Sequence, residues 1–320
     1  MKERIDIRKL AFVVPLVITI AATFLCIFML SRYIYGHKYG FTELFLNVIT
    51  IIISILSGII FTFFIKTFTQ TPPTLNVSVF GYPNSGKTVY LTVLFNDLMT
   101  NQYQDGISFR TYGSETIERI STDYQLLSTG KWLPPTPSDG VFYYHATISL
   151  SMLKNYKLQI GDYAGEKFKK ELQENNNFFH RTEYFKYAVS SDIVFLAVDL
   201  AQVLESFINS VDYVTGVENS FIAALNMMQE NRNLGFNRQI RFPVALLFMK
   251  ADLIKTKAMN ESRIVNEFDR LINYCNKNCS SFKYFFVSST GTRDLSMLMN
   301  SKMHPIGVVE PIIWSIKKCH

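Results

Sequence analysis

Cysteine is scarce in this chain, and so are the residue clusters that mark zinc sites and nucleic-acid-binding proteins. Only four cysteines occur among 320 residues, which is typical of a reducing compartment. Cys275 and Cys279 stand four apart with no second Cys or His pair nearby, which argues against zinc. After residue 70 no dense run of lysine and arginine occurs, although the net charge is +6. We therefore do not expect nucleic acid as a partner.

Charge is absent from two long segments near the N-terminus. Residues 10–30 and 44–65 contain no Asp, Glu, Lys or Arg. A helix rises about 1.5 Å per residue, so each segment can cross the roughly 30 Å core of a bilayer. The first segment is longer than the apolar part of a signal peptide, and a second follows soon after it. We predict two transmembrane helices, 10–30 and 44–65, that make residues 1–70 a membrane anchor.

Lysine and arginine are distributed unevenly around these two segments. Four precede the first segment, only Arg32 and Lys38 lie between the two, and Lys66 follows the second. By the positive-inside rule, the N-terminus and the chain after the second segment face the cytoplasm. The predicted location is the inner or plasma membrane, multi-pass, with the lipid bilayer as a partner. Residues 71–74, T-P-P-T, are the expected linker to a cytoplasmic domain.

A glycine-rich octapeptide, G-Y-P-N-S-G-K-T at residues 81–88, follows the apolar run 75–80 and precedes a helix-forming stretch. This is the strand, loop and helix context of a phosphate-binding loop, or Walker A motif. The loop N–H groups and the helix N-terminus would cradle a di- or triphosphate. Lys87 would reach the β- and γ-phosphates, and Thr88 would place its hydroxyl on Mg²⁺. The predicted nucleotide-binding residues of this loop are Gly81, Asn84, Ser85, Gly86, Lys87, Thr88 and Val89.

Beyond the linker the chain alternates apolar runs with helix-forming segments. The expected strands are 75–80, 141–151, 156–161, 192–199, 242–249 and 283–288, and the expected helices lie near 87–100, 114–127, 166–188, 217–231, 260–275 and 306–317. Continuous apolar strands suit a parallel sheet that is covered on both faces. We predict an α/β fold over residues 75–320: a three-layer P-loop NTPase sandwich with a mostly parallel sheet and one antiparallel edge strand.

The next candidate site residues follow the strand at 156–161, in the segment G-D-Y-A-G-E. Open α/β sheets bind ligands at the carboxyl ends of their strands. Asp162 would hold Mg²⁺ through a water, and Gly165 would offer its N–H to the γ-phosphate. Thr136, in the segment L-P-P-T-P-S just before the strand at 141–151, is the expected threonine that completes the metal site. Thr129 is the alternative, and a proline-stiffened turn is the purely structural interpretation of this segment.

Two further strand ends predict which base is bound. M-K-A-D at residues 249–252 is close to the N/T-K-x-D pattern, in which the aspartate accepts two hydrogen bonds from guanine. Asp252 and Lys250 would fill the two roles, although Met249 replaces the usual Asn or Thr. The segment V-S-S-T-G would then present a backbone N–H to the guanine O6 at Ser289, and Ser288 is the other predicted nucleotide-binding residue of this segment. The order of these motifs favours GTP and GDP over ATP.

Together these motifs are similar to those of the translation-factor and Ras-type clade of P-loop GTPases, the TRAFAC clade. The likeness covers residues 75–291. The segments G-K-T-V-Y-L-T-V-L-F, K-W-L-P-P-T-P and P-I-G-V-V-E-P-I-I-W further resemble the double-GTPase-like bacterial proteins of that clade. This resemblance implies hydrolysis of GTP to GDP and phosphate, with Mg²⁺, and a nucleotide-dependent switch that acts on a partner protein.

Catalysis is the least regular part of the pattern. Glu166 stands where many Ras-like members carry a glutamine that orients the attacking water. A carboxylate there is repelled by the γ-phosphate unless it is protonated or turned away, so we expect slow intrinsic hydrolysis. The predicted catalytic residues are Lys87, Thr136, Gly165 and Glu166, and the predicted metal ligands are Thr88, Thr136 and Asp162.

Three alternatives stay open at this point. Asn84 falls where potassium-activated GTPases carry an asparagine, so K⁺ is a candidate cofactor, and a turn-forming Asn is the structural explanation. A non-hydrolysing, nucleotide-binding membrane scaffold or receptor is the rival to a GTPase switch. An ATP-using P-loop protein is the third interpretation.

Overall fold

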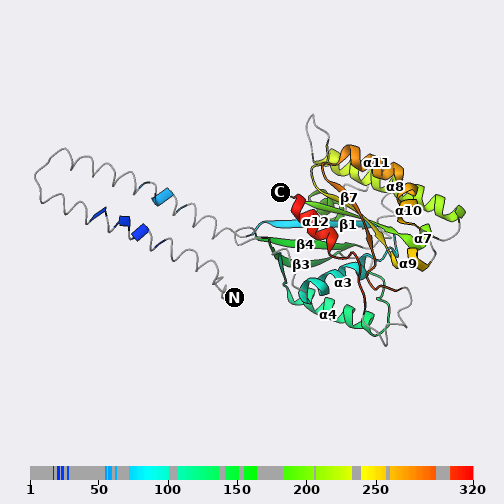
Figure 1. The fold of residues 1–320 in the computed structure, drawn as a ribbon, viewed down its shortest axis with the longest axis horizontal. Helices are drawn as coiled ribbons and strands as arrows, with labels where there is room; N and C mark the ends of the chain where they lie inside the picture. Colours follow the sequence, from blue (N-terminus) through cyan, green and yellow to red (C-terminus); the bar gives the residue numbers. More distant parts are fainter. Residues whose placement is uncertain are drawn as a thin grey trace, which may run out of the picture. The chain divides into compact units, whose positions relative to one another are not determined.

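The computed structural model describes most of the chain after residue 71 and a few isolated helical positions before it. The described ranges are 72–100, 107–136, 141–150, 155–163, 183–204, 207–232, 239–256, 260–292 and 303–319, with single positions within 17–28 and 55–62. The chain divides into two compact units (Figure 1): residues 1–72 with 149–155, and residues 73–148 with 156–320.

The two expected membrane spans, 10–30 and 44–65, lie almost wholly outside the described residues. The positions that are described there are helical, and Phe28 and Ile59 are each 61% exposed. Thr62 donates a hydrogen bond to the carbonyl of Gly58 four residues earlier, as a hydroxyl does within a helix. Among the described residues, no helix combines the length and the apolar character needed to cross a membrane. The anchor therefore stays a prediction.

One sheet of seven strands forms the centre of the second unit. The strands are β1 (Thr74–Gly81), β2 (Ser108–Thr111), β3 (Val141–Ser149), β4 (Asn155–Tyr163), β5 (Ile193–Asp199), β6 (Val244–Met249) and β7 (Phe282–Val287). Their order across the sheet is β2-β3-β4-β1-β5-β6-β7. The pairs β4–β1, β1–β5, β5–β6 and β6–β7 are parallel. The mostly parallel α/β sheet is therefore confirmed.

The edge of the sheet differs from the expectation in one respect. Only residues 150–154 separate β3 from its neighbour β4, so these two strands run antiparallel, because a parallel connection needs a crossover of a dozen or more residues. However, β3 is not the edge strand. The short strand β2 lies outside it, and Tyr112 donates a backbone hydrogen bond to His145. The sequence of β2, S-F-R-T, is too short and too polar to stand out as a strand.

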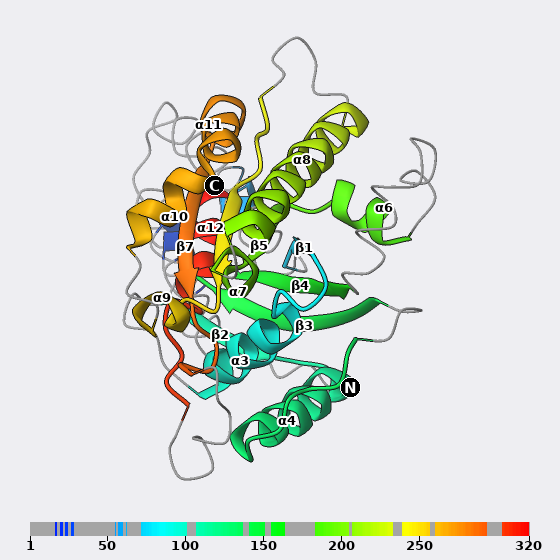
Figure 2. The same cartoon turned by 90° about the vertical axis from the view of Figure 1, so that its right-hand side faces the viewer.

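Helices cover both faces of this sheet, as Figures 1 and 2 show. The helices are α3 (Lys87–Thr100), α4 (Ser114–Ser128), α6 (Glu183–Val189), α7 (Leu200–Val203), α8 (Phe207–Asn231), α9 (Asp252–Thr256), α10 (Glu261–Glu267), α11 (Asp269–Asn278) and α12 (Glu310–Lys318). On β5, Leu196 faces a buried cluster shared with Phe221 of α8 and Leu271 of α11. The preceding side chain of β5, Phe195, instead contacts the ring of Tyr90 in α3. This alternation gives the three predicted layers, because neighbouring strand residues point to opposite faces.

Some helix boundaries differ from the sequence-based expectation for identifiable reasons. The helix expected at 260–275 breaks at Phe268, a fully buried residue that ends α10 and precedes α11. The helix expected from residue 306 begins at Glu310, because Ile306 bridges to Ser288 and Gly307 has a φ of 68°. The part of the 166–188 helix before Glu183 lies outside the described residues.

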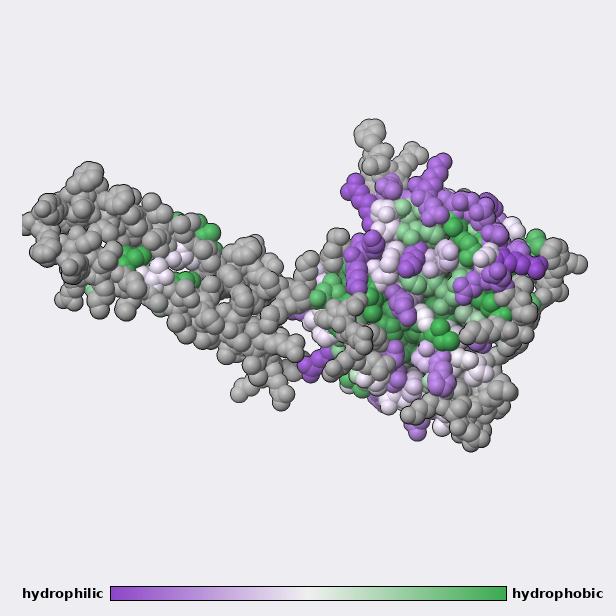
Figure 3. Space-filling model, viewed as in Figure 1, coloured by the Kyte–Doolittle hydropathy of each residue, from purple (hydrophilic) through white to green (hydrophobic). Residues whose placement is uncertain are grey.

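The parallel strands place five strand ends at one edge of the sheet. Four of the strands end at Gly81, Asp199, Met249 and Val287, and Asp162 is the penultimate residue of β4. Elsewhere, hydrophilic and hydrophobic side chains are intermixed on the face of the second unit seen in Figure 3. The carboxyl edge of the sheet is therefore the place to seek the functional site.

Candidate nucleotide-binding site

The loop between β1 and α3 has the backbone that phosphate binding requires. Asn84 and Gly86 both have positive φ angles, 62° and 88°, so the chain curls tightly before the helix begins. At Gly81 an added Cβ would lie 2.8 Å from the carbonyl oxygen of Ala197, so only glycine lets β1 pass this close to β5. The Tyr90 N–H bonds to Gly86 at 2.9 Å and closes the first turn of α3.

Lys87 folds back against this loop and is only 7% exposed. Its Nζ donates to the carbonyls of Gly81 and Tyr82 at 2.9 and 3.0 Å, and to the Ser85 hydroxyl at 3.3 Å. Burial lowers the pKa of Lys87 to about 8, although the nearby carboxylates of Asp162 and Asp199 oppose that shift. The ammonium therefore lies in the loop on neutral acceptors, and a phosphate would offer it stronger, charged ones.

Three side-chain oxygens from separate segments meet beside the lysine. The Thr88 hydroxyl lies 2.7 Å from the Thr136 hydroxyl, and it donates to the Asp162 carboxylate at 3.1 and 3.3 Å. Asp162 is 1% exposed, and burial raises its pKa, opposed by the positive charges of Lys87 and Arg119. The alternative threonine, Thr129, is exposed and caps the end of α4 through the carbonyl of Leu126.

This oxygen set fits a magnesium ion. Hydroxyl and carboxylate oxygens are the hard donors that Mg²⁺ prefers, usually with one or two carboxylates and the substrate phosphates. Within the part of the chain that the structure describes, no three His, Cys, Asp or Glu side chains are grouped to hold a metal. A bound ion would thus depend on Asp162, the two threonines and a phosphate. The structure brings Thr88, Thr136 and Asp162 together, and their metal-binding role stays a prediction.

Lys250 connects the far side of the site to the loop. It has a positive φ of 62°, and its Nζ donates to the carbonyl of Asn84 at 2.9 Å. The same atom forms an ion pair with Asp199 at 2.7 Å. Asp199 is 2% exposed and caps the short helix α7 by accepting a hydrogen bond from Ala201. The stem of Lys250 is thereby held in place along the cavity wall.

Asp252 begins α9 and is held by a serine of the next loop. The Ser288 hydroxyl donates to Oδ1 of Asp252, and the Gly291 N–H donates to the same Ser288 oxygen. Ser288 is 1% exposed, so it supports Asp252 from behind. Ser289 and Thr290, in contrast, line the cavity itself. The two predicted serines therefore have different positions.

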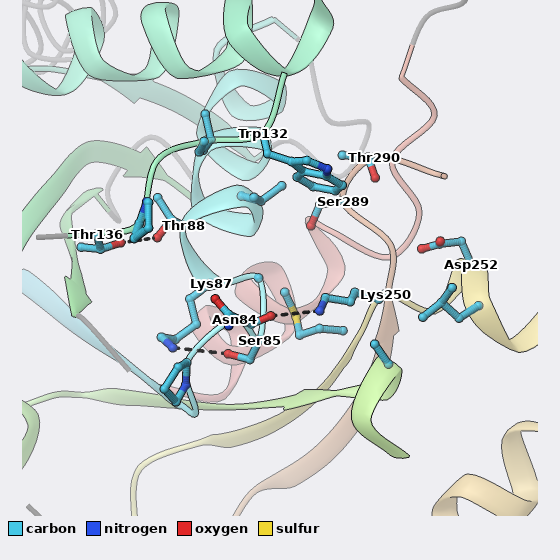
Figure 4. Close-up of a pocket in the computed structure, with 18 of the residues that line it drawn as sticks. Asn84, Ser85, Lys87, Thr88, Trp132, Thr136, Lys250, Asp252, Ser289 and Thr290 are labelled. Atoms are coloured by element: carbon cyan, nitrogen blue, oxygen red, sulfur yellow. Dashed lines mark hydrogen bonds between the residues drawn. The ribbon is translucent and has the colours of Figure 1, made fainter. Parts of the chain in front are cut away.

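A cavity of about 420 Å³ connects the loop, the two threonines, Lys250 and Asp252 (Figure 4). Its lining residues are Pro83, Asn84, Ser85, Gly86, Lys87, Thr88, Val89, Trp132, Leu133, Pro134, Pro135, Thr136, Ala201, Met249, Lys250, Asp252, Leu253, Ser289, Thr290 and Thr292. In Figure 4, Lys87 and Thr88 lie on one side of the cavity and Lys250 and Asp252 on the other, with Ser289 and Trp132 between them. This separation places phosphate-type groups and base-type groups where one nucleotide can touch both.

The predicted site residues and those that the structure brings to the site are not the same set. Gly165 and Glu166 lie outside the described residues. Asp199 and Trp132 were not assigned a role from the sequence, although Trp132 falls within the K-W-L-P-P-T-P segment. Asp199 directly follows the apolar run 193–198, and a carboxylate at the end of a predicted buried strand was the sequence signal that could have identified it. Arg119 was not assigned a role either, because it lies on a helix without a motif.

Comparison with known proteins gives one strong match. No curated protein matches the chain. Among solved structures, a protein described as nucleolar GTP-binding protein 1 from Plasmodium falciparum has a TM-score of 0.38 and 13% identity, and the match covers 78% of this chain and 89% of that one. That likeness is too weak to say more about this chain. A family model described as Double-GTPase 2 matches residues 76–302, most of the chain, and the segments 81–88, 249–252 and 287–291 all lie inside the match. The chain therefore belongs to the Double-GTPase 2 family and is a P-loop GTPase by sequence and fold.

Proposed function

We propose that this protein is a membrane-anchored GTP-binding protein and a slow GTPase that acts as a nucleotide-dependent switch on a partner protein. One observation supports this above all others. A single cavity is lined by the phosphate-loop lysine Lys87, the hydroxyls of Thr88 and Thr136, and the base-recognition pair Lys250 and Asp252. Family membership supports the same conclusion.

Guanine is the base that fits the far end of the cavity. The Asp252 carboxylate can accept hydrogen bonds from the N1–H and the 2-amino group of guanine, whereas adenine offers no such pair of donors. Ser288 holds that carboxylate by donating to one of its oxygens. A site built to accept two hydrogen bonds strongly rejects a ligand that leaves the acceptors unpaired. We therefore infer GTP and GDP as the ligands.

Magnesium is the proposed metal cofactor, held by Thr88, Thr136 and Asp162. When bound, Mg²⁺ would neutralise charge on the phosphates and position them. The chain's own residues then have separate tasks. Lys87 exchanges its carbonyl partners for phosphate oxygens, and the loop N–H groups orient the nucleotide. Hydrolysis is slow because Glu166 replaces the glutamine that orients water in many relatives of this clade.

Potassium stays an additional candidate cofactor. Asn84 has a left-handed backbone, which asparagine tolerates better than most residues, and its carbonyl accepts the bond from Lys250. Both facts support a turn-forming role and leave the potassium role to experiment. Comparing hydrolysis in K⁺ with hydrolysis in Na⁺ at equal ionic strength separates the two, because a structural asparagine predicts equal rates.

Membrane anchoring is proposed from the two charge-free segments, 10–30 and 44–65. The full-length chain should stay with the membrane fraction after alkaline carbonate extraction, which strips peripheral proteins. A protease added from the cytoplasmic side should reach the domain after residue 74. Release of the chain by carbonate contradicts the anchor and leaves the nucleotide proposal untouched.

The nucleotide proposal is tested with the full-length chain purified in mild detergent. Saturable binding of GTP and GDP, with ATP at least a hundredfold weaker, is the expected result. Asp252→Asn should shift preference from GTP to XTP, because the amide donates where the carboxylate accepted. Asp269→Asn, an exposed aspartate on α11, is the matched control and should keep GTP.

Hydrolysis is then followed in a single turnover with excess protein. Slow release of phosphate by the wild type, together with no release by Lys87→Ala, supports the GTPase. GTP binding with no turnover in any salt, or with added lysate, supports the non-hydrolysing scaffold instead. Equal affinity for ATP and GTP, unchanged in Asp252→Asn, contradicts guanine recognition.

A further inference from the structure

A helix that carries no nucleotide-binding motif reaches the centre of the site. Arg119, in α4, places its guanidinium 3.6 Å from Oδ2 of Asp162. Its Nε lies 3.5 Å from Asp123, one turn further along the same helix. Asp162 is the buried carboxylate of the oxygen set, so an element inserted between α3 and β3 contacts a proposed metal ligand.

The arginine is fixed in position by aromatic rings. Its guanidinium carbon lies 4.2 Å from the ring centre of Phe142 and 5.8 Å from that of Tyr144, both on β3. Those two rings pack edge to face at 4.9 Å. The Arg119 side chain is 25% exposed, so most of it is enclosed between α4 and the sheet. Stacking of a guanidinium on aromatic faces restricts the directions that it can take.

The Asp162 carboxylate is contacted from two helices at once. Thr88 of α3 donates a hydroxyl to its oxygens, and Arg119 of α4 supplies a positive charge at Oδ2. The side chain of Asp162 is 0% exposed, so protein groups rather than water orient it. At 3.6 Å the arginine contact is an ion pair longer than a hydrogen bond, so it attracts Oδ2 of Asp162 and leaves the lone pairs of that oxygen available to a metal.

We infer that Arg119 is a positioning residue for the magnesium-binding carboxylate, and that it makes α4 respond to the metal. The inference rests on the proposed function. Partners that orient a metal ligand usually change metal affinity about 10–100-fold when they are removed. When Arg119 is removed, the buried Asp162 keeps its hydrogen bonds from Thr88 but loses its ion pair. The carboxylate is then less well aligned for Mg²⁺.

The test measures how much Mg²⁺ tightens nucleotide binding. Binding of a fluorescent GDP to the full-length chain is titrated first in EDTA and then against Mg²⁺. The midpoint of this titration is the Mg²⁺ concentration at which half of the gain in GDP affinity is reached. We expect Arg119→Met to raise this midpoint about tenfold and to change the GDP affinity in EDTA less than twofold. Arg119→Lys, which keeps the charge, should recover part of the loss. Arg110→Met, on the exposed side of β2, should match the wild type.

A second variant keeps the inference testable if Arg119→Met does not fold. Phe142→Leu removes the ring beneath the guanidinium and leaves the charge, so it should raise the Mg²⁺ requirement by a smaller factor. Hydrogen exchange supplies a readout independent of affinity. Peptides from α4 should gain protection when Mg²⁺ is added to the GDP complex of the wild type, and Arg119→Met should lose that gain.

The outcomes separate this inference from the proposed function. No saturable binding of GDP by the wild type overturns both. Mg²⁺-dependent GDP binding that is the same in Arg119→Met and wild type overturns the role of Arg119 alone. A lower Mg²⁺ requirement in Arg119→Met also overturns it, because the guanidinium would then repel the metal rather than orient its ligand.

Discussion

The Nζ atom of Lys250 lies 2.7 Å from Oδ2 of Asp199, a carboxylate that is 2% exposed at the end of β5. The same Nζ donates to the carbonyl of Asn84 in the phosphate-binding loop. One lysine thus links the end of β5 to the loop that would bind phosphate, while its stem lines the cavity. The position of Asp199 is itself fixed, because its backbone N–H donates to the Tyr213 hydroxyl and its Oδ1 accepts from Ala201.

We predict that Asp199→Asn weakens guanine-nucleotide binding about tenfold, near the lower end of the effect of losing a hydrogen bond to a charged group. An asparagine oxygen can still cap α7, but its amide would face the ammonium of Lys250. Affinities for GDP and for pyrophosphate are measured by calorimetry on the full-length chain. The loss should be larger for GDP, because Lys250 is proposed to lie along the base.

Asp212→Asn, an exposed aspartate on α8, is the control for the Asp199 variant. It should bind GDP as the wild type does. Equal losses for GDP and pyrophosphate in Asp199→Asn would mean that the ion pair supports the phosphate loop and not the base-recognition loop.

Trp132 should report whether the cavity is filled. It lines the cavity and is 57% exposed, and the chain has one other tryptophan, Trp314, which packs on Phe285. In a Trp314→Phe background the remaining emission comes from Trp132 alone. GDP binding should remove water from the indole and change its emission intensity and wavelength. In a Trp132→Phe background, the emission of Trp314 should stay constant, and a GDP-dependent change there would contradict this assignment.

The pH dependence of polyphosphate binding should follow Lys87. Its pKa is lowered to about 8 by burial, so the free protein loses this charge as pH rises past that value. Binding then includes uptake of one proton, and the affinity for pyrophosphate without Mg²⁺ should fall about fivefold between pH 8 and pH 9, because the charged fraction of Lys87 falls by about that factor. Lys87→Arg stays charged over this range, so its profile supplies the correction for the ligand's own ionisation. A wild-type profile with the same slope as Lys87→Arg would contradict the prediction.

The lowered pKa of Lys87 should also make the stability of the protein depend on pH. An unfolded lysine keeps its proton up to about its ordinary pKa of 10.5, whereas the folded one releases it near pH 8. Between these values the unfolded chain binds more protons, so the free energy of unfolding should rise with pH. Urea denaturation of wild type and Lys87→Met at pH 8 and pH 9.5 measures the difference. The rise should be smaller in Lys87→Met.

The buried core predicts a clear mutational contrast. Leu196 on β5 is fully buried in the cluster that includes Phe221, so Leu196→Ala should lower the free energy of unfolding by about 2–5 kcal/mol. Ile117 on α4 is 41% exposed, and Ile117→Ala should cost less than about 1 kcal/mol. Urea unfolding of both variants gives the comparison. Similar losses would show that the packing around Leu196 is looser than the structure indicates.

Local sequence patterns were sufficient to predict the elements that have a clear local pattern of their own. The apolar run at 193–198 and the loop at 81–88 predicted a strand that is covered on both faces and a phosphate-type turn, and the structure has a wholly buried β5 and a tight turn there. The short polar strand β2 and the break at Phe268 were missed, because each depends on contacts far along the chain rather than on a local pattern. Whether residues 10–30 and 44–65 cross a membrane stays a prediction.

The site shows the same division. Thr88, Asp162 and Asp252 belong to motifs, and the structure places each of them at the edge of the sheet expected for it. Asp199 and Arg119 act through partners that lie 51 and 43 residues away in sequence, Lys250 and Asp162. Such pairings follow only from the way β5, β6 and α4 are brought together in space. Sequence spacing alone therefore could not assign them.

The Nζ atom of Lys87 donates to the carbonyls of Gly81 and Tyr82, the first two residues of its own loop. The chain itself therefore supplies contacts that stabilise the turn between β1 and α3. In the proposed exchange of GDP for GTP we expect this turn to stay formed, so that no refolding of the segment has to precede the next binding event.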